Sequence, residues 1–403
     1  MFEISSKIKF QAPSTKFQKF IRFWHSCIKV EPKNLRKSAL SAGDFLTKLE
    51  TKNLKRETTN PKHLLVIRLS ALGDVAMCVP VLRVLCATYP HLRVTVLSKP
   101  FHKPLFDELP NVNFYPAEVK EKHKGFTGLL KLASTLKKEG IDGVADLHNV
   151  LRSNVLGGYF MFKGIPVVKI DKGRAEKKAL TRTNNKQFKP LKSTFERYAA
   201  VFEELGFPID LEQHQFPLKK EIPEKIIPLF DNTYTKHIGI APFAAHVGKM
   251  YPLELMEQVI AKLDAEKQTQ IFLFGGGKHE EALLNTLTQK YTTTTNLAGT
   301  LSFEQELEVI SNLDGMLAMD SGNAHLAAIY GVPTITIWGV THPYAGFYPF
   351  GQPLENALLA DRNQFPLIPT SVYGNKLPKG YENVMKTISP QQIFDRLLKV
   401  LQR

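Results

Sequence analysis

The chain has 403 residues, of which 43% are hydrophobic, so it can form large buried cores and is neither wholly disordered nor collagen-like. Its length predicts two domains. It is strongly basic, with 53 Lys and Arg residues against 38 Asp and Glu residues and a net charge of +15. Such a charge is typical of proteins with an anionic partner, which can be nucleic acid, a membrane surface or a phosphorylated substrate.

The positive charge is concentrated in two segments. Residues 1–62 carry a net charge of +9 and residues 163–192 a net charge of +8, whereas the rest of the chain has a net charge of −2. The basic character therefore belongs to these two segments, and the remaining sequence is ordinary in charge.

Cysteine content and hydropathy indicate a cytoplasmic protein. No CxxC pair occurs, which favours reduced thiols at all three cysteines, namely Cys27, Cys78 and Cys86. No apolar run approaches the ~18 residues needed to span a bilayer. The N-terminus is unlike a signal peptide, because Glu3 stands where a basic region should begin and Arg22 and His25 interrupt the most apolar stretch. We expect the protein neither to cross a membrane nor to be secreted by the general route.

Residues 1–62 are expected to form a basic N-terminal extension. Apolar residues within 17–28 recur at helical spacing beside Lys and Arg residues, which predicts a basic amphipathic helix. This helix either packs on the main body or lies on anionic lipid, and in the second case residues 1–44 would hold the protein peripherally at the inner face of the cytoplasmic membrane. Residues 45–62 resemble a polar linker.

Strands and helices alternate from residue 63 onward. In the first half, apolar runs predict strands at 63–69, 93–97, 113–115, 141–147 and 167–170, and apolar periodicity predicts helices at 75–86, with a kink at Pro80, 127–139 and 194–205. The alternation restarts after Pro223 and Pro228. Strands are then predicted at 237–241, 270–274, 315–319 and 334–338, and helices from about 253 and at 280–290, 303–312, 323–330 and 390–401.

This alternation predicts an α/β protein with two Rossmann-like domains whose parallel sheets face a central cleft. We expect an N-terminal domain at 63–225 and a C-terminal domain at 226–403. In open parallel sheets, ligands bind beyond the carboxyl ends of the strands. The candidate site residues all lie at such positions.

The first candidate group, Ser70–Asp74, follows the first strand and opens the first helix. Gly73 permits tight backbone geometry, and the N–H groups of the loop can face an anion. Asp74 is either a helix-capping residue or a general base that takes a proton from an attacking hydroxyl. The absence of GxGxxG at this point weakens the case for a dinucleotide-binding oxidoreductase.

The second group, Asp320–Ala328, follows the strand at 315–319. Ser321, Gly322 and Asn323 place free N–H groups at the positive end of a helix, where a diphosphate can rest. His325 lies one turn further on and is either a satisfied structural histidine or a donor to phosphate.

Further candidates follow other strands. Lys249 ends the loop PFAAHVGK and is either a solvated charge or a phosphate ligand. After the strand at 270–274, a run of three glycines permits close approach of a ligand, and Glu280 or Glu281 can bind a ribose hydroxyl. Three residues at or after the end of the strand at 141–147 also face the cleft. These are Asp146, His148 and Arg152. HExxH, Walker A and GxSxG motifs and clustered Cys/His ligands are absent, so we expect no catalytic metal.

Taken together and in this order, these motifs resemble glycosyltransferase family 9, the bacterial heptosyltransferases of lipopolysaccharide core assembly. LLVIRLSALGD followed by x5-P-x-L resembles the opening of that family, KMYP resembles its K-x-W-P, and MDSGNAHLAA resembles its D-[ST]-G-x-x-H-x-A-A. NLAGTLSFEQ and GVPTITIWG also fit. The resemblance covers residues 63–403 and excludes 1–62.

The resemblance implies a GT-B fold, with the acceptor in the N-terminal domain and the donor nucleotide in the C-terminal one. It implies metal-independent, inverting transfer from an ADP-activated sugar, with no cofactor beyond that donor. Carried over, Asp74 is the base, while the leaving diphosphate is held by Lys249, the Asp320 loop, the backbone of Ser321–Asn323 and His325. Glu281 or Glu280 contacts the ribose and Leu301 the adenine, and the acceptor meets Gly73, Asp146, His148 and Arg152.

Three departures concern the donor site. Ala244 and Ala245 stand where the family often has hydroxyl residues, so two donor contacts to phosphate are either missing or supplied by His246, and Tyr251 replaces the usual Trp. Segment 163–192 is expected to be a mobile basic loop that receives an anionic lipid-linked acceptor such as the lipid A/Kdo core. Alternatively, this segment is an ordinary solvated surface loop.

Other functions stay open to different degrees. A GT-B transferase with another nucleotide-sugar donor, or a nucleotide-sugar epimerase on the same fold, is compatible with the motifs. Nucleic acid is not an expected partner, because neither basic segment interleaves aromatic residues along one face. A binding protein without catalysis would lack a working base, and the presence of Asp74 argues against it.

Overall fold

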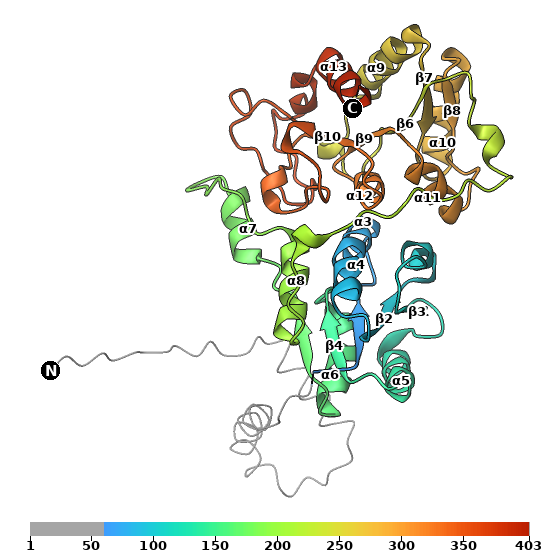
Figure 1. Cartoon of the computed structure of the whole chain (residues 1–403). Helices are drawn as coiled ribbons and strands as arrows, with labels where there is room; N and C mark the ends of the chain where they lie inside the picture. The colour runs from blue at the N-terminus through green and yellow to red at the C-terminus, as the bar shows by residue number, and fades with distance from the viewer. Residues whose placement is uncertain (1–59, 403) are drawn as a thin grey trace, which may run out of the picture. The chain divides into compact units, whose positions relative to one another are not determined.

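The structure, a computed structural model, describes residues 60–402 (Figure 1). The expected amphipathic helix and the membrane contact through residues 1–44 lie outside the described residues. Within residues 60–402, no helix is long and apolar enough to cross a membrane.

Five parallel strands form the first sheet, in the order β3-β2-β1-β4-β5. Their bounds are β1 (His63–Ile67), β2 (Arg93–Ser98), β3 (Val112–Pro116), β4 (Gly143–Asp146) and β5 (Val167–Lys169). Every residue of β1 is buried, as expected of a central strand covered on both faces. Successive strands run outward from β1 on one side and from β4 on the other, so the order reverses between these two neighbours.

Six parallel strands form the second sheet, in the order β11-β10-β9-β6-β7-β8. Their bounds are β6 (Lys236–Ala241), β7 (Thr269–Leu273), β8 (Thr294–Asn296), β9 (Gly315–Met319), β10 (Thr334–Trp338) and β11 (Ala357–Leu359). Here the order reverses between β6 and β9. The two parallel sheets confirm the predicted α/β architecture.

Helices connect the strands of both sheets. In the first half they are α3 (Leu72–Ala76), α4 (Cys78–Thr88), α5 (Gly125–Lys138), α6 (Leu151–Phe162), α7 (Arg174–Thr181) and α8 (Thr194–Glu204). In the second half they are α9 (Leu253–Glu266), α10 (Lys278–Lys290), α11 (Phe303–Ser311), α12 (Gly322–Ala328) and α13 (Pro390–Leu401). Each predicted helix has a counterpart, although the one at 75–86 is divided into α3 and α4, and α6 and α7 are additional.

Two predictions from the sequence are wrong. The helix expected at 75–86 is two helices that break at Met77, and Pro80 falls in the first turn of α4, where its missing N–H leaves no hydrogen bond unmade. Segment 163–192 is not a loop throughout, because it contains β5 and α7. Leu180 of α7 is fully buried, so this helix is packed into the protein.

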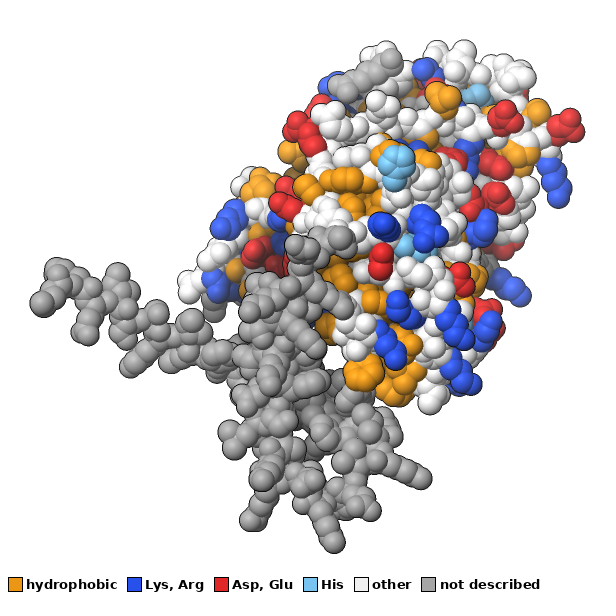
Figure 2. Space-filling view, turned by 60° about the horizontal axis from the view of Figure 1, so that its bottom comes forward, with side chains coloured by type: hydrophobic (Ala, Val, Ile, Leu, Met, Phe, Trp, Pro, Cys, Tyr) orange, Lys and Arg blue, Asp and Glu red, His pale blue; other side chains and the backbone are white. Residues whose placement is uncertain are grey.

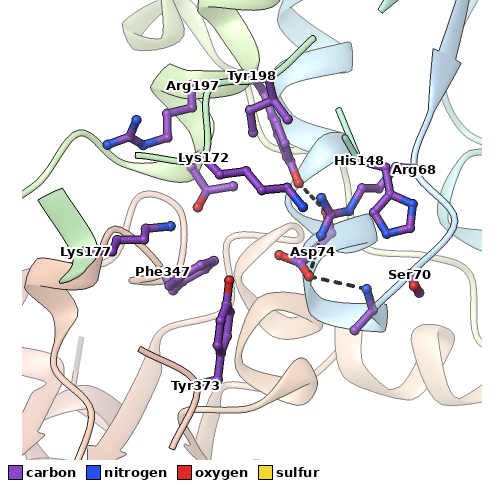
Figure 3. Close-up of a pocket in the computed structure, with 13 residues that line it drawn as sticks. Arg68, Ser70, Asp74, His148, Lys172, Lys177, Arg197, Tyr198, Phe347 and Tyr373 are labelled. Atoms are coloured by element: carbon purple, nitrogen blue, oxygen red, sulfur yellow. Dashed lines mark hydrogen bonds and ion pairs between the residues drawn. The ribbon is translucent and has the colours of Figure 1, made fainter. Parts of the chain in front are cut away.

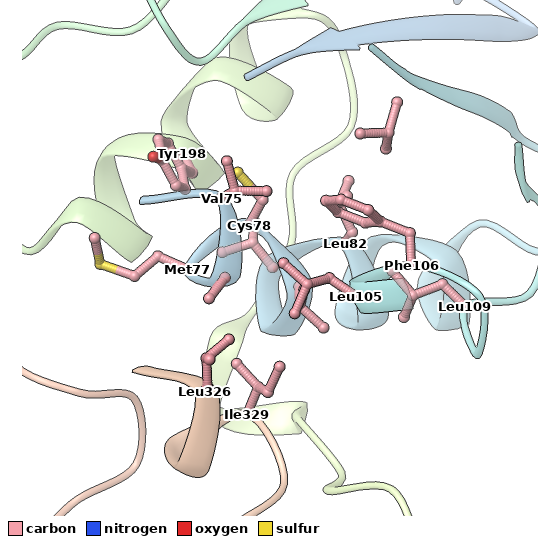
Figure 4. Packing of buried hydrophobic residues seen from close by; sticks show 14 of the residues in the cluster. Val75, Met77, Cys78, Leu82, Leu105, Phe106, Leu109, Tyr198, Leu326 and Ile329 are labelled. Atoms are coloured by element: carbon pink, nitrogen blue, oxygen red, sulfur yellow. The ribbon is translucent and has the colours of Figure 1, made fainter. Parts of the chain in front are cut away.

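The N-terminus of α3 meets α12 between the two sheets (Figure 1). A Cβ on Gly73 would lie 2.9 Å from Cδ2 of His325 and 3.4 Å from Cα of Gly322, so only glycine permits this approach. The buried cluster beside the junction joins residues of both halves (Figure 4), among them Val75, Leu82, Phe106, Leu326 and Ile329. The core therefore fixes the loop after β1 against the loop after β9.

Candidate active site

The order reversals of the two sheets position the candidate residues. Ile67 pairs with Asp146 across β1 and β4, so the Ser70–Asp74 loop lies beside the residues that follow β4. Ala241 pairs with Ala318 across β6 and β9, so the loop that ends at Lys249 lies beside Asp320. Both groups occupy the place where open α/β sheets bind ligands.

Asp74 is the third residue of α3 and faces a cavity (Figure 3). Its Oδ2 accepts a hydrogen bond from the N–H of Ala71 at 3.3 Å and lies 2.5 Å from Nη2 of Arg68. The side chain is still 27% exposed. Capping and access to a ligand, which the sequence presented as alternatives, are therefore compatible in one carboxylate.

The cavity has a volume of about 210 Å³ and is strongly cationic. Asp74 is its only acidic lining residue among the described residues, while its basic and aromatic lining side chains are Arg68, His148, Lys172, Lys177, Arg197, Tyr198, Phe347 and Tyr373. Burial and the charges of Arg68 and Lys172 lower the pKa of His148 to about 4, so this ring is neutral at pH 7. The cavity is suited to an anionic ligand.

Two candidate acceptor residues do not reach this cavity. Asp146 is fully buried, and its Oδ1 accepts N–H hydrogen bonds from His148 at 2.9 Å and Asn149 at 2.7 Å. It therefore shapes the turn after β4 and thereby places His148, whose Nδ1 accepts from the N–H of Leu69 at 3.4 Å. Arg152 is exposed on α6 and is not part of the cavity lining.

A second cavity of about 330 Å³ lies at the junction of α3 and α12. Gly73 lines it together with the start of α12, namely Ser321, Gly322 and Asn323. Free N–H groups at this helix start can bind a diphosphate. Ala71 lines both cavities, so the two meet at the loop that carries Asp74.

Lys249 forms an ion pair with Asp320, with 2.8 Å between Nζ and Oδ2. Both side chains are largely buried, with exposed fractions of 16% and 8%. Asp320 therefore holds the ammonium next to the start of α12. His325 is buried as well, burial lowers its pKa to about 4, and its Nδ1 has no partner among the described residues. At pH 7 a neutral His325 can donate one hydrogen bond.

The remaining donor candidates are placed differently. Glu280 lines the second cavity and accepts the N–H of Gly276 at 2.7 Å, whereas Glu281 lies beside Gly299 outside the lining. Leu301 packs against the buried core and is not part of the lining either. Between the two acids, the geometry favours Glu280 for a ribose contact.

The three departures have local consequences. Ala244 and Ala245 do line the second cavity, so this wall offers no hydroxyl, and His246 is exposed outside the lining. Tyr251 is buried and donates its Oη hydrogen to the carbonyl of Ile388 at 2.7 Å. Tyr251 therefore stabilises the packing of this region through its buried hydroxyl.

Sequence reasoning did not find several lining residues. Arg68 could have been recognised from the sequence, since it is the one charged residue inside the apolar run before the loop. Lys172 and Lys177 belong to the basic segment 163–192, but nothing singled them out within it. Phe347 and Tyr373 come from loops after β10 and β11, and no pattern links them to Asp74.

Among residues 60–402, no group of three or more His, Cys, Asp or Glu side chains is arranged to hold a metal ion. Two parallel sheets with cavities that meet between them define a protein of the GT-B class. The sequence model of glycosyltransferase family 9 (heptosyltransferase) matches residues 129–374, well over half of the chain. The chain therefore belongs to this family, and the resemblance noted from the motifs is confirmed.

Individual relatives agree with the family model. The lipopolysaccharide core heptosyltransferase OpsX of Haemophilus influenzae is 26% identical over 294 residues, which cover 71% of this chain and 81% of the relative. The structure of the family 9 glycosyl transferase from Veillonella parvula matches with a TM-score of 0.66 at 19% identity, over 85% of this chain and 97% of that one. The Escherichia coli heptosyltransferase WaaC with ADP-2-deoxy-2-fluoro heptose matches at 0.58 and 18% identity, over 84% and 99%. The chain is a glycosyltransferase similar to the lipopolysaccharide core heptosyltransferases.

Proposed function

We propose that this enzyme transfers a heptose from ADP-heptose to an anionic glycolipid acceptor of the lipopolysaccharide core, with inversion and without a metal ion. The observation that carries the proposal is the position of Asp74. It faces a cationic cavity at the point where that cavity meets a second one built around a helix N-terminus. A base between an acceptor site and a diphosphate site is what glycosyl transfer requires.

In this mechanism Asp74 takes the proton of the acceptor hydroxyl while the oxygen of that hydroxyl attacks the anomeric carbon of the donor sugar. The bond from that carbon to the diphosphate oxygen breaks on the opposite face, and ADP leaves with the electron pair. The N–H groups of Ser321–Asn323 and the ammonium of Lys249 stabilise the charge that develops on the diphosphate. Neutral His325 adds one hydrogen bond.

The assignment of domains follows from these roles. Residues 63–225 bind the acceptor, with His148 in the cavity wall, and residues 226–403 bind the nucleotide sugar. Glu280 binds the ribose, while a contact of Leu301 with the adenine rests on the family resemblance alone. That the Escherichia coli relative was solved with an ADP-heptose analogue supports the same nucleotide here.

Peripheral attachment to the inner face of the cytoplasmic membrane through residues 1–44 is part of the proposal. A chain lacking residues 1–44 should sediment less with anionic vesicles than the full chain and should bind nucleotide equally well. Equal sedimentation of both proteins would reject the attachment.

The test of the proposed function is a transfer assay in EDTA with ADP-heptose, ADP-glucose and UDP-glucose as donors and lipid A/Kdo core as acceptor. We expect ADP release and a heptosylated lipid of inverted anomeric configuration only with ADP-heptose. Transfer from another donor would move the enzyme to a different sugar. Conversion of the donor without any acceptor would instead indicate the epimerase alternative.

A further inference from the structure

The cations of the Asp74 cavity differ in whether they have partners. Arg68 is paired with Asp74 itself, and Arg197 is paired with Glu176 at 2.7 Å and Asp171 at 3.6 Å. For Lys172 and Lys177, the described residues supply neither an ion-pair partner nor a hydrogen-bond acceptor. Two ammonium groups in the cavity wall are therefore uncompensated.

Lys177 is unusual among these groups because it is also buried, with only 8% of its surface exposed. Its Nζ lies 4.1 Å from the ring centroid of Phe347, a residue of the second half of the chain, and Figure 3 shows the two side by side at the cavity. Burying an ammonium group without an acid is unfavourable. Burial and the charge of Arg197 lower the pKa of Lys177 to about 8.

The surrounding structure holds Lys177 in this place. Arg197 is 4% exposed, and its ion pair with Glu176 fixes the first turn of α7. Gly173 precedes this helix in the left-handed region at φ 58°, and a Cβ there would overlap the guanidinium of Arg197. α7 is thereby fixed with Lys177 facing inward, while its neighbour Lys178 is exposed.

Exposed basic side chains elsewhere are in a different situation. Figure 2 shows Lys and Arg side chains on one face of the molecule, where they lie among apolar and acidic side chains in contact with solvent. Such groups need no partner, because water solvates them. Lys177 lacks this solvation, so a ligand that enters the cavity is the available source of a counter-charge.

The position of the two lysines restricts that ligand. Lys172, Lys177 and Asp74 line the same cavity of about 210 Å³, and Figure 3 shows Lys172 extending toward Asp74. An acidic group that reaches the lysines is therefore close to the hydroxyl that Asp74 activates. Two ammonium groups match an acid of up to two negative charges, such as a phosphate monoester or a carboxylate.

We propose that Lys172 and Lys177 form a subsite for one acidic group, a phosphate monoester or a carboxylate, carried by the same acceptor sugar whose hydroxyl is glycosylated. This inference rests on the proposed function for the identity of the reaction. It makes Lys177 a specificity-determining residue, which selects acceptors by the acidic group beside the attacking oxygen.

The test compares Lys177→Met, which keeps an unbranched side chain against Phe347, with Lys178→Met on the exposed side of the same helix. Steady-state transfer is measured with the lipid A/Kdo acceptor in three forms: untreated, phosphatase-treated and carboxyl-methylated. We expect Lys177→Met to raise KM for the untreated acceptor about 10- to 100-fold, the range for loss of a charge-assisted hydrogen bond, with kcat nearly unchanged. Lys178→Met should behave like the wild type.

The modified acceptors identify the source of the acid. The wild type should discriminate against whichever treatment removes the recognised group, and Lys177→Met should lose that discrimination. An unchanged KM in Lys177→Met, or an equal loss toward acidic and neutralised acceptors, would overturn the subsite.

A binding measurement separates this inference from the proposed reaction. Inorganic phosphate and glucuronate are titrated calorimetrically into Lys177→Met and Lys178→Met, so that anion binding at any other site is common to both proteins. Weaker binding of one of the two anions by Lys177→Met alone supports the subsite even if the wild type transfers no heptose. Equal binding by both variants overturns the subsite, whatever the reaction.

Discussion

Arg68 joins Asp74 to the end of a neighbouring strand. Its Nη2 lies 2.5 Å from Oδ2 of Asp74, and its Nη1 donates to the carbonyl of Leu147, just after β4, at 2.7 Å. The candidate base is thus held from both strands that flank the order reversal of the first sheet. Tyr198 adds a third constraint, since its Oη donates to the backbone carbonyl of Asp74 at 3.1 Å.

Because one guanidinium makes both contacts, Arg68→Lys should loosen Asp74 without removing positive charge. A single ammonium cannot reproduce the two directed contacts. We expect kcat to fall by up to about 10²-fold, the loss that a displacement of ~1 Å in an active site can cause, while ADP affinity is unchanged. Full activity in Arg68→Lys would show that the charge alone suffices.

Asp74→Asn should abolish most of the turnover, because the amide cannot accept the proton of the acceptor hydroxyl. The expected loss in kcat is about 10²- to 10⁴-fold, the usual contribution of a general base. ADP binding should be retained, as Asp74 does not line the second cavity. Asp107→Asn, which changes the surface pair with Lys103, is the matched control. A kcat within threefold of the wild type would remove Asp74 from the mechanism.

Lys249 and Asp320 lend themselves to a double-mutant cycle. Lys249→Met should weaken ADP binding about 10- to 100-fold and, by leaving Asp320 buried and unpaired, lower the free energy of unfolding by ~3 kcal/mol. Adding Asp320→Asn should restore much of the stability but not the ADP affinity. Calorimetry and urea denaturation measure the two effects. Recovery of ADP affinity in the double variant would contradict a phosphate role for Lys249.

Gly73→Ala should separate the two loops that meet between the sheets. The added Cβ would lie 2.9 Å from His325, and the overpacking is expected to lower the free energy of unfolding by about 1–3 kcal/mol and to reduce kcat. Gly158→Ala in α6 is the control, because among the described residues nothing lies within 4 Å of its Cβ. That helix substitution should be neutral or stabilising. Similar effects of both substitutions would argue against a tight junction.

His214 should make the protein less stable in acid. Its ring lies 4.7 Å from the rings of both Phe216 and Phe350, neither ring nitrogen has a partner among the described residues, and burial lowers its pKa to about 4. The unfolded chain therefore binds more protons below pH 6.5, and stability falls as the pH drops toward 4.

His214→Phe removes this proton uptake. Urea denaturation should show that the gain in unfolding free energy over the wild type is greater at pH 5 than at pH 7, by about 2 kcal/mol. The other buried histidines are common to both proteins and cancel in the comparison. A gain that is the same at both pH values would show that His214 does not titrate in this range.

Sequence patterns predicted nine of the eleven strands in residues 60–402, but not the three-residue outer strands β8 and β11. They also placed Asp74, Lys249 and the Asp320 loop after strand ends, because buried parallel strands are short apolar runs and ligand residues follow them. They did not predict α6, in which Gly157 and Gly158 interrupt the helical pattern. Nor did they predict α7, whose first turn is tied to α8 by the ion pair of Glu176 with Arg197. This ion pair joins residues 21 positions apart in the sequence, so apolar periodicity does not reveal it.

The same limit applies within the site. Whether a candidate near the end of a strand reaches a cavity depends on the direction of its side chain. Glu280 and His148 line a cavity, whereas Glu281 and Asp146 do not. The aromatic wall formed by Phe347 and Tyr373 arises only when the two halves of the chain pack together. Local periodicity carries no information on either point.

The most direct test of the account is a calorimetric titration of the full chain with ADP, UDP, GDP and dTDP in EDTA, repeated with Asp74→Asn. We expect selective ADP binding, equal in both proteins, because the nucleotide occupies the cavity at α12 and the base acts only on the acceptor. Preference for another nucleotide would contradict the ADP-linked donor. Absence of binding to all four would contradict the assignment of the second cavity as a nucleotide site.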